Sequence, residues 1–132
     1  MNNTVKDSGN RRVFDTGAQR DMAAGKGAFH LLPFFALERV ALRFEGGSVK
    51  YGDHNWRKGI PTSSFVNSAI RHIIKHVMGF RDEDHLAAAA FNVLCLMETE
   101  TMIEMGILPP KLNDLYRFIN LSEDTPDDTI EG

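Results

Sequence analysis

The chain has 132 residues, a size typical of one domain, and its formal net charge of −3 excludes the strong basic field that attracts nucleic acid polymers. Its single cysteine, Cys95, excludes a disulfide framework and agrees with a reducing compartment. Residues 1–10 are polar and lack the apolar core of a secretory signal, and nowhere do eighteen apolar residues follow one another. We therefore expect a cytoplasmic protein with no membrane partner.

Both ends of the chain have compositions that are typical of unstructured segments. Residues 1–15 are polar and of mixed charge, and they predict a flexible tail. Residues 121–132 are acidic and contain Pro126, and they predict a disordered tail. The residues between them, 16–120, predict a single helical domain.

The segment 16–30 is rich in glycine and shows no regular period. Glycines flank Arg20 and Lys26, so backbone N–H groups and cations could meet an anion here. The alternative is a glycine-rich surface loop, because the spacing is not that of a phosphate-binding loop.

The first helix is predicted from Phe34 to about Glu45, with Pro33 near its first turn. An apolar stripe at helical spacing predicts the face that meets the core, and it comprises Phe34, Leu37, Ala41 and Phe44. Glu38 and Glu45 share another face. The pair Gly46-Gly47 predicts a kink or the end of the helix.

Residues 50–59 combine glycine, aromatic, basic and Asp or Asn residues without a clean period, which predicts a structured loop. Trp56, the only tryptophan, anchors this loop on the core in one interpretation. In the other interpretation, its ring packs against a planar ligand.

A second helix is predicted from Phe65 to Met78, after the capping residues 61–64 and before Gly79. Its predicted buried face comprises Phe65, Val66, Ala69, Ile70, Ile73 and Val77. His72 and His76 are expected mostly on the other side. Their i, i+4 spacing can hold a metal ion, but no third ligand lies nearby in the sequence, so surface histidines are the alternative.

The third helix is the most distinctive element. It opens with three acids at residues 82–84, where the helix dipole favours negative charge, and its apolar run extends to about Glu98 without Gly or Pro. One face carries His85, Ala88, Ala89 and Asn92. A helix that is apolar nearly all round is usually central in a bundle, so His85 and Asn92 need partners, either structural groups or a ligand. Cys95 is expected to be a buried thiol.

Residues 106–110 break the chain, and a short helix is then predicted from Pro110 to about Asn120, with Leu112, Leu115 and Ile119 directed inward. No stretch alternates as a strand would. The fold class is therefore predicted to be all-α, a bundle of about four helices.

The distribution of charges suggests phosphate chemistry. Asp82, Glu83 and Asp84 supply the oxygen donors that Mg²⁺ prefers, and Glu38 lies on a helix that must pack against them. Cations that could neutralise phosphate oxygens are Arg20, Lys26, Lys50, Lys58 and Arg71. Together these parts fit metal-assisted phosphate chemistry. The alternative is a solvated, acid-rich helix start with unrelated surface lysines.

Several segments resemble, in order and spacing, those of a phage-associated family, the dATP/dGTP diphosphohydrolase N-terminal domain. The most specific are Lys50-Tyr51-Gly52 with Asn55-Trp56, and the helix from His85-Leu86-Ala87 to Asn92. The others are Gly25-Lys26-Gly27, Leu31-Leu32-Pro33, Ala36-Leu37-Glu38, Arg71-His72 and Asp82-Glu83-Asp84. The similarity covers about residues 16–100. That family is in turn similar to the all-α nucleoside triphosphate pyrophosphohydrolases of the MazG and dimeric dUTPase kind.

The resemblance implies that a nucleoside triphosphate, expected to be a purine deoxynucleotide, is cut between its α and β phosphates to give a monophosphate and pyrophosphate. It implies Mg²⁺ or Mn²⁺ held by Glu38, Asp82 and Asp84, and catalytic roles for Glu38, Asp84 and His85. The implied substrate-binding residues are Lys26, Lys50, Tyr51, Asn55, Trp56, Arg71 and Asn92. It also implies a homo-oligomer, a dimer or tetramer, in the cytoplasm of a phage-infected bacterial host.

Two departures from the MazG pattern leave other functions open. The Glu-Glu-x-x-Glu run of those enzymes is represented here only by Glu38, which is followed by Arg39 and Leu42. On the third helix, Ala88 and Ala89 follow His85 by three and four residues. The alternatives are a non-catalytic nucleotide-binding module and an oligomeric interaction bundle.

Overall fold

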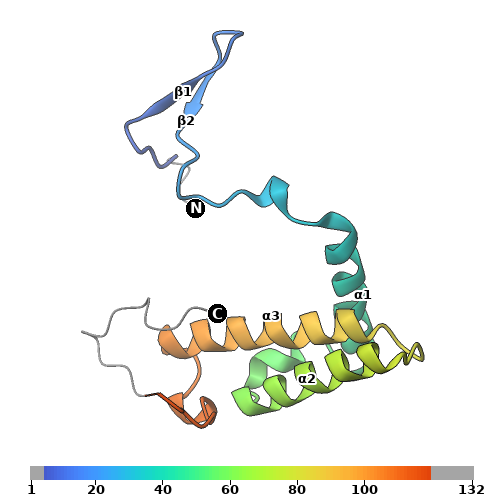
Figure 1. The fold of residues 1–132 in the computed structure, drawn as a ribbon. Helices are drawn as coiled ribbons and strands as arrows, with labels where there is room; N and C mark the ends of the chain where they lie inside the picture. Colours follow the sequence, from blue (N-terminus) through green and yellow to red (C-terminus); the bar gives the residue numbers. More distant parts are fainter. Residues whose placement is uncertain (1–4, 120–132) are drawn as a thin grey trace. The chain divides into compact units, whose positions relative to one another are not determined.

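The computed structural model describes residues 5–119, and the chain divides into two compact units, residues 1–33 and residues 34–132. The fold is all-α, as predicted. The described residues form three α-helices, where about four were predicted, together with one small sheet of two strands (Figure 1). The predicted acidic tail, 121–132, lies outside the described residues.

The first unit contains a β-hairpin that the sequence pattern did not predict. β1 (Arg11–Val13), within the predicted tail, pairs antiparallel with β2 (Gln19–Asp21). The N–H of Gly17 donates to the carbonyl of Phe14 at 2.8 Å and closes the turn, with φ of +87° at Gly17. Strands of three residues are too short to display the alternation by which strands are recognised. A short 3₁₀ helix, η1 (Phe29–Leu31), follows the hairpin.

In the second unit, α1 (Phe34–Tyr51) is longer than predicted because it continues through Gly46 and Gly47. Gly52, with φ of +91°, ends it instead. A glycine in a helix interior costs about 1 kcal/mol relative to alanine, which is too little to end a helix that tertiary packing supports. The chain then makes a short 3₁₀ helix, η2 (Asn55–Lys58).

α2 (Thr62–Met78) begins earlier than predicted and ends at Gly79, as predicted. Gly79 has φ of +98°, and its N–H donates to the carbonyl of His76 at 3.0 Å. The first turn of α2 is capped from a distant part of the chain. The carboxylate of Asp114 accepts the N–H of Ser63 at 3.0 Å and its hydroxyl at 2.7 Å, so the segment after α3 is tied to the start of α2.

α3 (His85–Glu104) is the central helix of this unit, as predicted, because both α1 and α2 pack against it (Figure 1). Asp84 caps its first turn by accepting the N–H of Ala87 at 3.1 Å. The predicted face is buried and continues along the helix as His85, Ala88, Ala89, Asn92, Cys95, Thr99 and Met102. Burial raises the pKa of the Cys95 thiol to about 12.

The predicted buried faces of the other two helices were partly wrong. On α1, Val40 is buried and Phe44 half-buried, whereas the exposed members of the expected stripe are Phe34, Leu37 and Ala41. On α2, Phe65, Ala69 and also His72 are buried, whereas the exposed members of the expected face are Ile70, Ile73 and Val77. Both helices carry apolar residues on more than one side, so helical spacing alone does not decide which side meets α3.

The predicted fourth helix is absent from the residues up to 119, where only η3 (Pro110–Leu112) forms. Leu112 packs near Gly59, since a Cβ built on that glycine would lie 3.2 Å from the Leu112 Cδ1 atom. The chain then leaves the helical path at Asn113, with ψ of 73°, and Asp114 is used to cap α2. Ile119, which was expected inside, is exposed.

α3 is also the one described helix that is long and apolar enough to cross a membrane. A buried core helix has the same composition, and α3 buries His85 and Asn92 against the other helices. A single such helix is weak evidence for a membrane segment.

Candidate functional site

An open groove of about 1210 Å³ lies in the helical unit, between α1, the segment 52–60, the start of α2 and the first half of α3. Sites for small molecules usually have volumes of about 300–1,000 Å³, so the groove is large enough for a nucleotide. Five of the seven residues that the sequence predicts to bind substrate line this groove: Lys50, Tyr51, Asn55, Trp56 and Asn92.

The apolar wall of the groove is a cluster of three aromatic rings. Phe44 of α1 lies 4.5 Å from Phe91 of α3, measured between ring centroids, and 6.4 Å from Trp56 with nearly perpendicular rings. Trp56 is half-buried and also lines the groove, so it fits both interpretations of this residue, the anchor and the ligand-packing ring. The guanidinium of Arg57 covers the Trp56 ring at 4.8 Å and is held by Glu98 at 2.5 Å.

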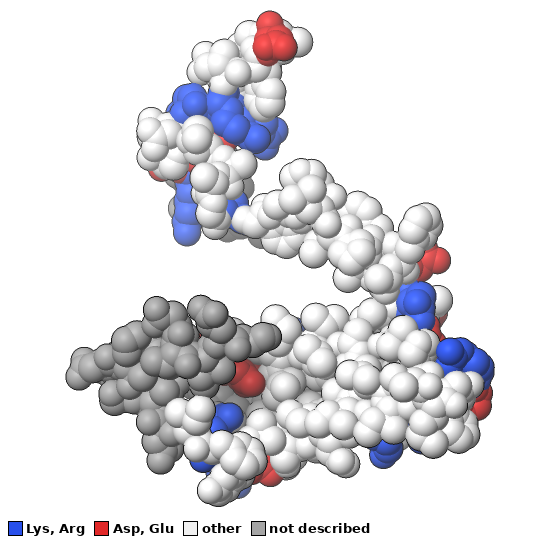
Figure 2. Space-filling view, in the orientation of Figure 1, with Lys and Arg blue, Asp and Glu red and all other residues white. Residues whose placement is uncertain are grey.

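Four cations line the groove, and three of them are paired with acids. Arg39 holds Asp84, Arg43 holds Glu83 at 2.7 Å, and Arg57 holds Glu98. Basic and acidic side chains accordingly lie next to each other where α1 meets the start of α3 (Figure 2). Lys50 is different, because it has no carboxylate within 4.0 Å among residues 5–119 and lies 5.1 Å above the Tyr51 ring. Lys50 is therefore the groove cation most available to a phosphate.

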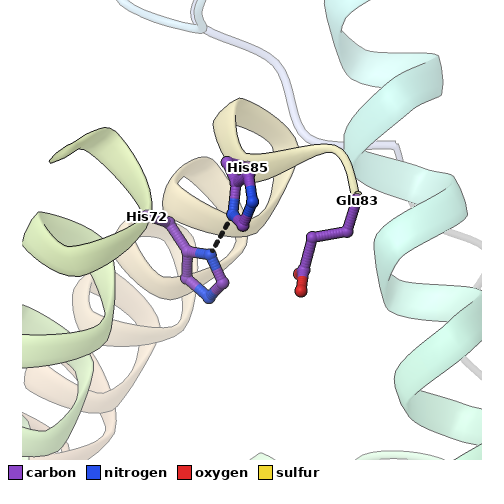
Figure 3. A group of neighbouring side chains, drawn as sticks. All are labelled: His72, Glu83 and His85. Atoms are coloured by element: carbon purple, nitrogen blue, oxygen red, sulfur yellow. Dashed lines mark hydrogen bonds between the residues drawn. The ribbon is translucent and has the colours of Figure 1, made fainter. Parts of the chain in front are cut away.

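His72, Glu83 and His85 form a second cluster (Figure 3). The Nδ1 atoms of His72 and His85 lie 2.9 Å apart, and both rings are buried, with 7% and 1% of their surface exposed. Burial lowers the pKa of His72. The Arg43 guanidinium is the main cause that lowers the pKa of Glu83. Glu83 also lines the groove, so it belongs to both features.

The expected metal ligands do not come together within one chain. Glu38 is exposed on α1, and it forms no ion pair with the described residues. Asp82 accepts a hydrogen bond from the Nε2 of His85 at 2.8 Å, which is the main cause that lowers its pKa. Asp84 is held by Arg39, which lowers its pKa to about 2. Among residues 5–119, the group placed to hold an ion is His72, Glu83 and His85.

The two remaining expected substrate-binding residues are Arg71, in the helical unit, and Lys26, in the first unit. Arg71 is exposed on α2, in a shallow hollow of about 390 Å³ with Phe80. Lys26 belongs to the first unit and pairs with Asp21 at 3.0 Å. Hydrogen bonds from Ser8, the main cause, and from Lys26 lower the pKa of Asp21.

Sequence reasoning missed Arg43 and underrated His72. For Arg43, the signal in the sequence was its i, i+4 spacing from Arg39, which places both arginines on one side of α1. They pair there with two adjacent acids, Asp84 and Glu83, at the start of α3. For His72, the signal in the sequence was that a second histidine, His85, begins the next helix, α3, so the two side chains could meet where α2 and α3 pack. The i, i+4 partner considered instead, His76, is not part of the cluster.

The geometry can be set against known proteins. A family model described as dATP/dGTP diphosphohydrolase, N-terminal, matches residues 16–106, more than half of the chain. The match includes every residue that lines the groove and all three members of the histidine cluster. No curated protein and no solved structure matches the chain. The chain therefore belongs to the dATP/dGTP diphosphohydrolase N-terminal family, which confirms the resemblance seen in its sequence.

Proposed function

We propose that this protein hydrolyses a purine deoxynucleoside triphosphate to the monophosphate and pyrophosphate, with the groove as its nucleotide site. The family description supports a diphosphohydrolase and a nucleoside triphosphate substrate. One observation carries the choice of site: Lys50, Tyr51, Asn55 and Trp56, from the end of α1 and the segment after it, line a single groove together with Asn92 of α3.

The groove offers separate surfaces for a base and for a triphosphate. Tyr51 and Trp56 present aromatic rings, and the amides of Asn55 and Asn92 can donate and accept hydrogen bonds at a base edge. Asn92 already donates from Nδ2 to the carbonyl of Ala88 at 2.8 Å, which fixes the orientation of its side chain. Lys50 supplies a positive charge for phosphate oxygens.

In the proposed reaction, the oxygen of a water molecule bonds to the α phosphorus, and that water releases a proton to the solvent. The bond from that phosphorus to the bridging oxygen of the β phosphate breaks, and the electron pair leaves with pyrophosphate. Negative charge accumulates on the leaving pyrophosphate, and cations placed beside it lower the barrier. Lys50 is the groove cation that we assign to this role.

A divalent cation, Mg²⁺ or Mn²⁺, remains part of the proposed activity. Glu38, Asp82 and Asp84 do not form a cluster that fits it in one chain, so these residues are not assigned to the metal. Mg²⁺ is commonly held by substrate phosphates together with one or two carboxylates, so it can reach the groove as a complex with the triphosphate.

We also infer that the protein acts as a homo-oligomer, a dimer or tetramer, in the deoxynucleotide metabolism of a phage-infected bacterial cytoplasm. The apolar outer faces of α2 and α3 support assembly. Their exposed members include Ile70, Ile73, Ile74 and Val77 on α2, and Val93, Leu94 and Met97 on α3. Much of the visible surface over these helices carries no charged side chains (Figure 2). Apolar patches of this kind mark interfaces in soluble proteins, and sedimentation as a monomer at micromolar concentration would contradict the assembly.

The test of the reaction is pyrophosphate release from each of the four deoxynucleoside triphosphates, with Mg²⁺, Mn²⁺ or EDTA. We expect metal-dependent release from dATP, dGTP or both. Lys50→Ala should weaken binding of the triphosphate about tenfold or more, because a charge-assisted hydrogen bond contributes about 1.5–3 kcal/mol. Arg71→Ala is the matched control, since Arg71 lies outside the groove and its loss should leave binding unchanged.

Calorimetry with the same nucleotides separates the remaining functions. Tight binding without pyrophosphate release, in a protein folded by circular dichroism, would replace the enzyme with a non-catalytic nucleotide-binding module. The absence of both binding and release would leave an oligomeric interaction bundle and overturn the nucleotide site.

A further inference from the structure

We propose that His72, Glu83 and His85 form a binding site for one divalent transition-metal ion of the Zn²⁺ class. Each of the three side chains offers one ligand atom, and the three atoms all lie within 4.8 Å of one another (Figure 3). Two ligands come from facing helices, His72 from α2 and His85 from α3, and Glu83 comes from the short connection between them. The site is thus built where the two helices are joined, and its formation depends on their packing.

The distance between the two histidines is close to that in a metal complex. A tetrahedral Zn²⁺ with Zn–N bonds of about 2.0–2.1 Å places two nitrogen ligands about 3.3 Å apart. The two Nδ1 atoms are 2.9 Å apart, so each ring needs to move by only a few tenths of an ångström to admit an ion. Because both rings are buried, little competing water reaches their Nδ1 atoms.

Hydrogen bonds between His85 and its neighbours leave its Nδ1 atom available to bind a metal ion. A carboxylate without a proton can only accept, so the Nε2 of His85 donates to Asp82, and the Nδ1 of His85 carries the free electron pair. In the metal-free state this Nδ1 accepts a hydrogen bond from the Nδ1–H of His72. When the ion binds, His72 moves its proton to Nε2 and its Nδ1 becomes the second nitrogen ligand. A carboxylate that orients a metal-binding histidine in this manner is common in zinc sites.

The third ligand, Glu83, is oriented from the other side. Arg43 donates to its Oε1 at 2.7 Å, which leaves Oε2 for an ion. Two imidazoles and a carboxylate form a donor set that suits Zn²⁺ and related ions, whereas Mg²⁺ prefers oxygen donors alone. Three protein ligands leave a fourth tetrahedral position for water or another small ligand, as in catalytic zinc sites. The inference concerns metal binding and does not depend on nucleotide hydrolysis.

The experiment uses the full chain without a polyhistidine tag, stripped of metal by chelation. Zn²⁺ is titrated by calorimetry and Co²⁺ by visible absorption, which distinguishes tetrahedral from octahedral coordination. We expect one ion per chain, a tetrahedral Co²⁺ spectrum, and displacement of Co²⁺ by Zn²⁺ but not by equimolar Mg²⁺. Glu83→Gln and His72→Asn should each weaken Zn²⁺ binding more than 100-fold, and Asp82→Asn about 10–100-fold, as expected for a residue that orients a ligand.

The matched control is His76→Asn, which removes another histidine of α2 one turn from His72 and should leave Zn²⁺ affinity unchanged. The Glu83 side chain is half-exposed, and glutamine has the same size, so Glu83→Gln should keep the fold. This variant therefore tests the site even if His72→Asn fails to fold. The inference is overturned if the folded wild-type protein binds neither ion at micromolar concentration. It is also overturned if His76→Asn abolishes binding while Glu83→Gln and Asp82→Asn retain it.

Discussion

Arg39 of α1 donates two hydrogen bonds, of 2.8 and 2.7 Å, to the carboxylate of Asp84, and the same carboxylate caps α3. One side chain thus closes the first turn of the central helix and joins it to its neighbour. The resemblance gave Asp84 a catalytic and metal-binding role. Its contacts give it a structural role within the chain, because both of its oxygens are engaged by donors.

We expect Asp84→Ala to lower the free energy of unfolding by about 1–2 kcal/mol, mostly through loss of the N-cap. The ion pair with Arg39 adds little, since both side chains are more than a third exposed to solvent. Urea denaturation monitored by circular dichroism at 222 nm measures the change. Glu38→Ala is the control, because Glu38 is exposed and should change stability by less than about 0.5 kcal/mol. Equal losses in both variants would contradict the structural role of Asp84.

Acid should destabilise the fold partly through this carboxylate. Arg39 lowers the pKa of Asp84 from its ordinary value of 3.8 to about 2, so the folded state favours the ionised form. This contribution is complete above about pH 4 and is lost as the pH falls toward 2. In Asp84→Asn, which cannot titrate, stability should fall less steeply over that interval than in the wild type. Urea midpoints measured between pH 5 and pH 2 test the difference, and parallel curves would contradict it.

Asp114 should be important for the segment that follows α3. Asp114→Ala removes the cap on Ser63 and should lower the urea midpoint of unfolding. It should also release residues 113–119, so that a protease cleaves there faster than in the wild type. Lys111→Ala, an exposed substitution in the same segment, is the control for stability. Unchanged cleavage in Asp114→Ala would show that Leu112 and Leu115 hold the segment without the cap.

Two glycines close to each other should respond in opposite ways to alanine. Gly47 has helical backbone angles, and a Cβ built on it meets no atom within 4 Å, so Gly47→Ala should raise stability by about 0.5–1 kcal/mol. Gly52 has φ of +91°, which strains any residue with a side chain, so Gly52→Ala should lower stability. Thermal unfolding of the two variants beside the wild type provides the comparison. Destabilisation by Gly47→Ala would mean that α1 does not continue to Tyr51.

The central helix shows what the sequence could predict. The buried face that contains His85, Ala88 and Asn92 followed from helical spacing, because α3 meets its neighbours along one continuous stripe. The end of α2 followed from Gly79, because a glycine with positive φ stops a helix through local backbone geometry alone. Both properties are set within a few residues of the chain, and such properties can be seen in a sequence.

Properties that depend on distant residues were missed. The cap on α2 comes from Asp114, which is 51 residues away from Ser63, and no local pattern links the two. The pairing of His72 with His85 likewise depends on how α2 and α3 pack. For the groove, sequence similarity identified Lys50, Tyr51, Asn55, Trp56 and Asn92 among the lining residues. It did not reveal that Asp82 and Asp84 are engaged by His85 and Arg39.

Because Cys95 is buried on α3, its reaction with thiol reagents can report how often the helices separate. The thiol is fully buried on α3 and its pKa is raised to about 12, so the reactive thiolate is scarce in the folded state. Because it is the only cysteine, every molecule labelled by a thiol reagent has exposed this one position. The labelling rate at low denaturant therefore measures how often α3 separates from its neighbours, without any mutation and without a probe being added to the core.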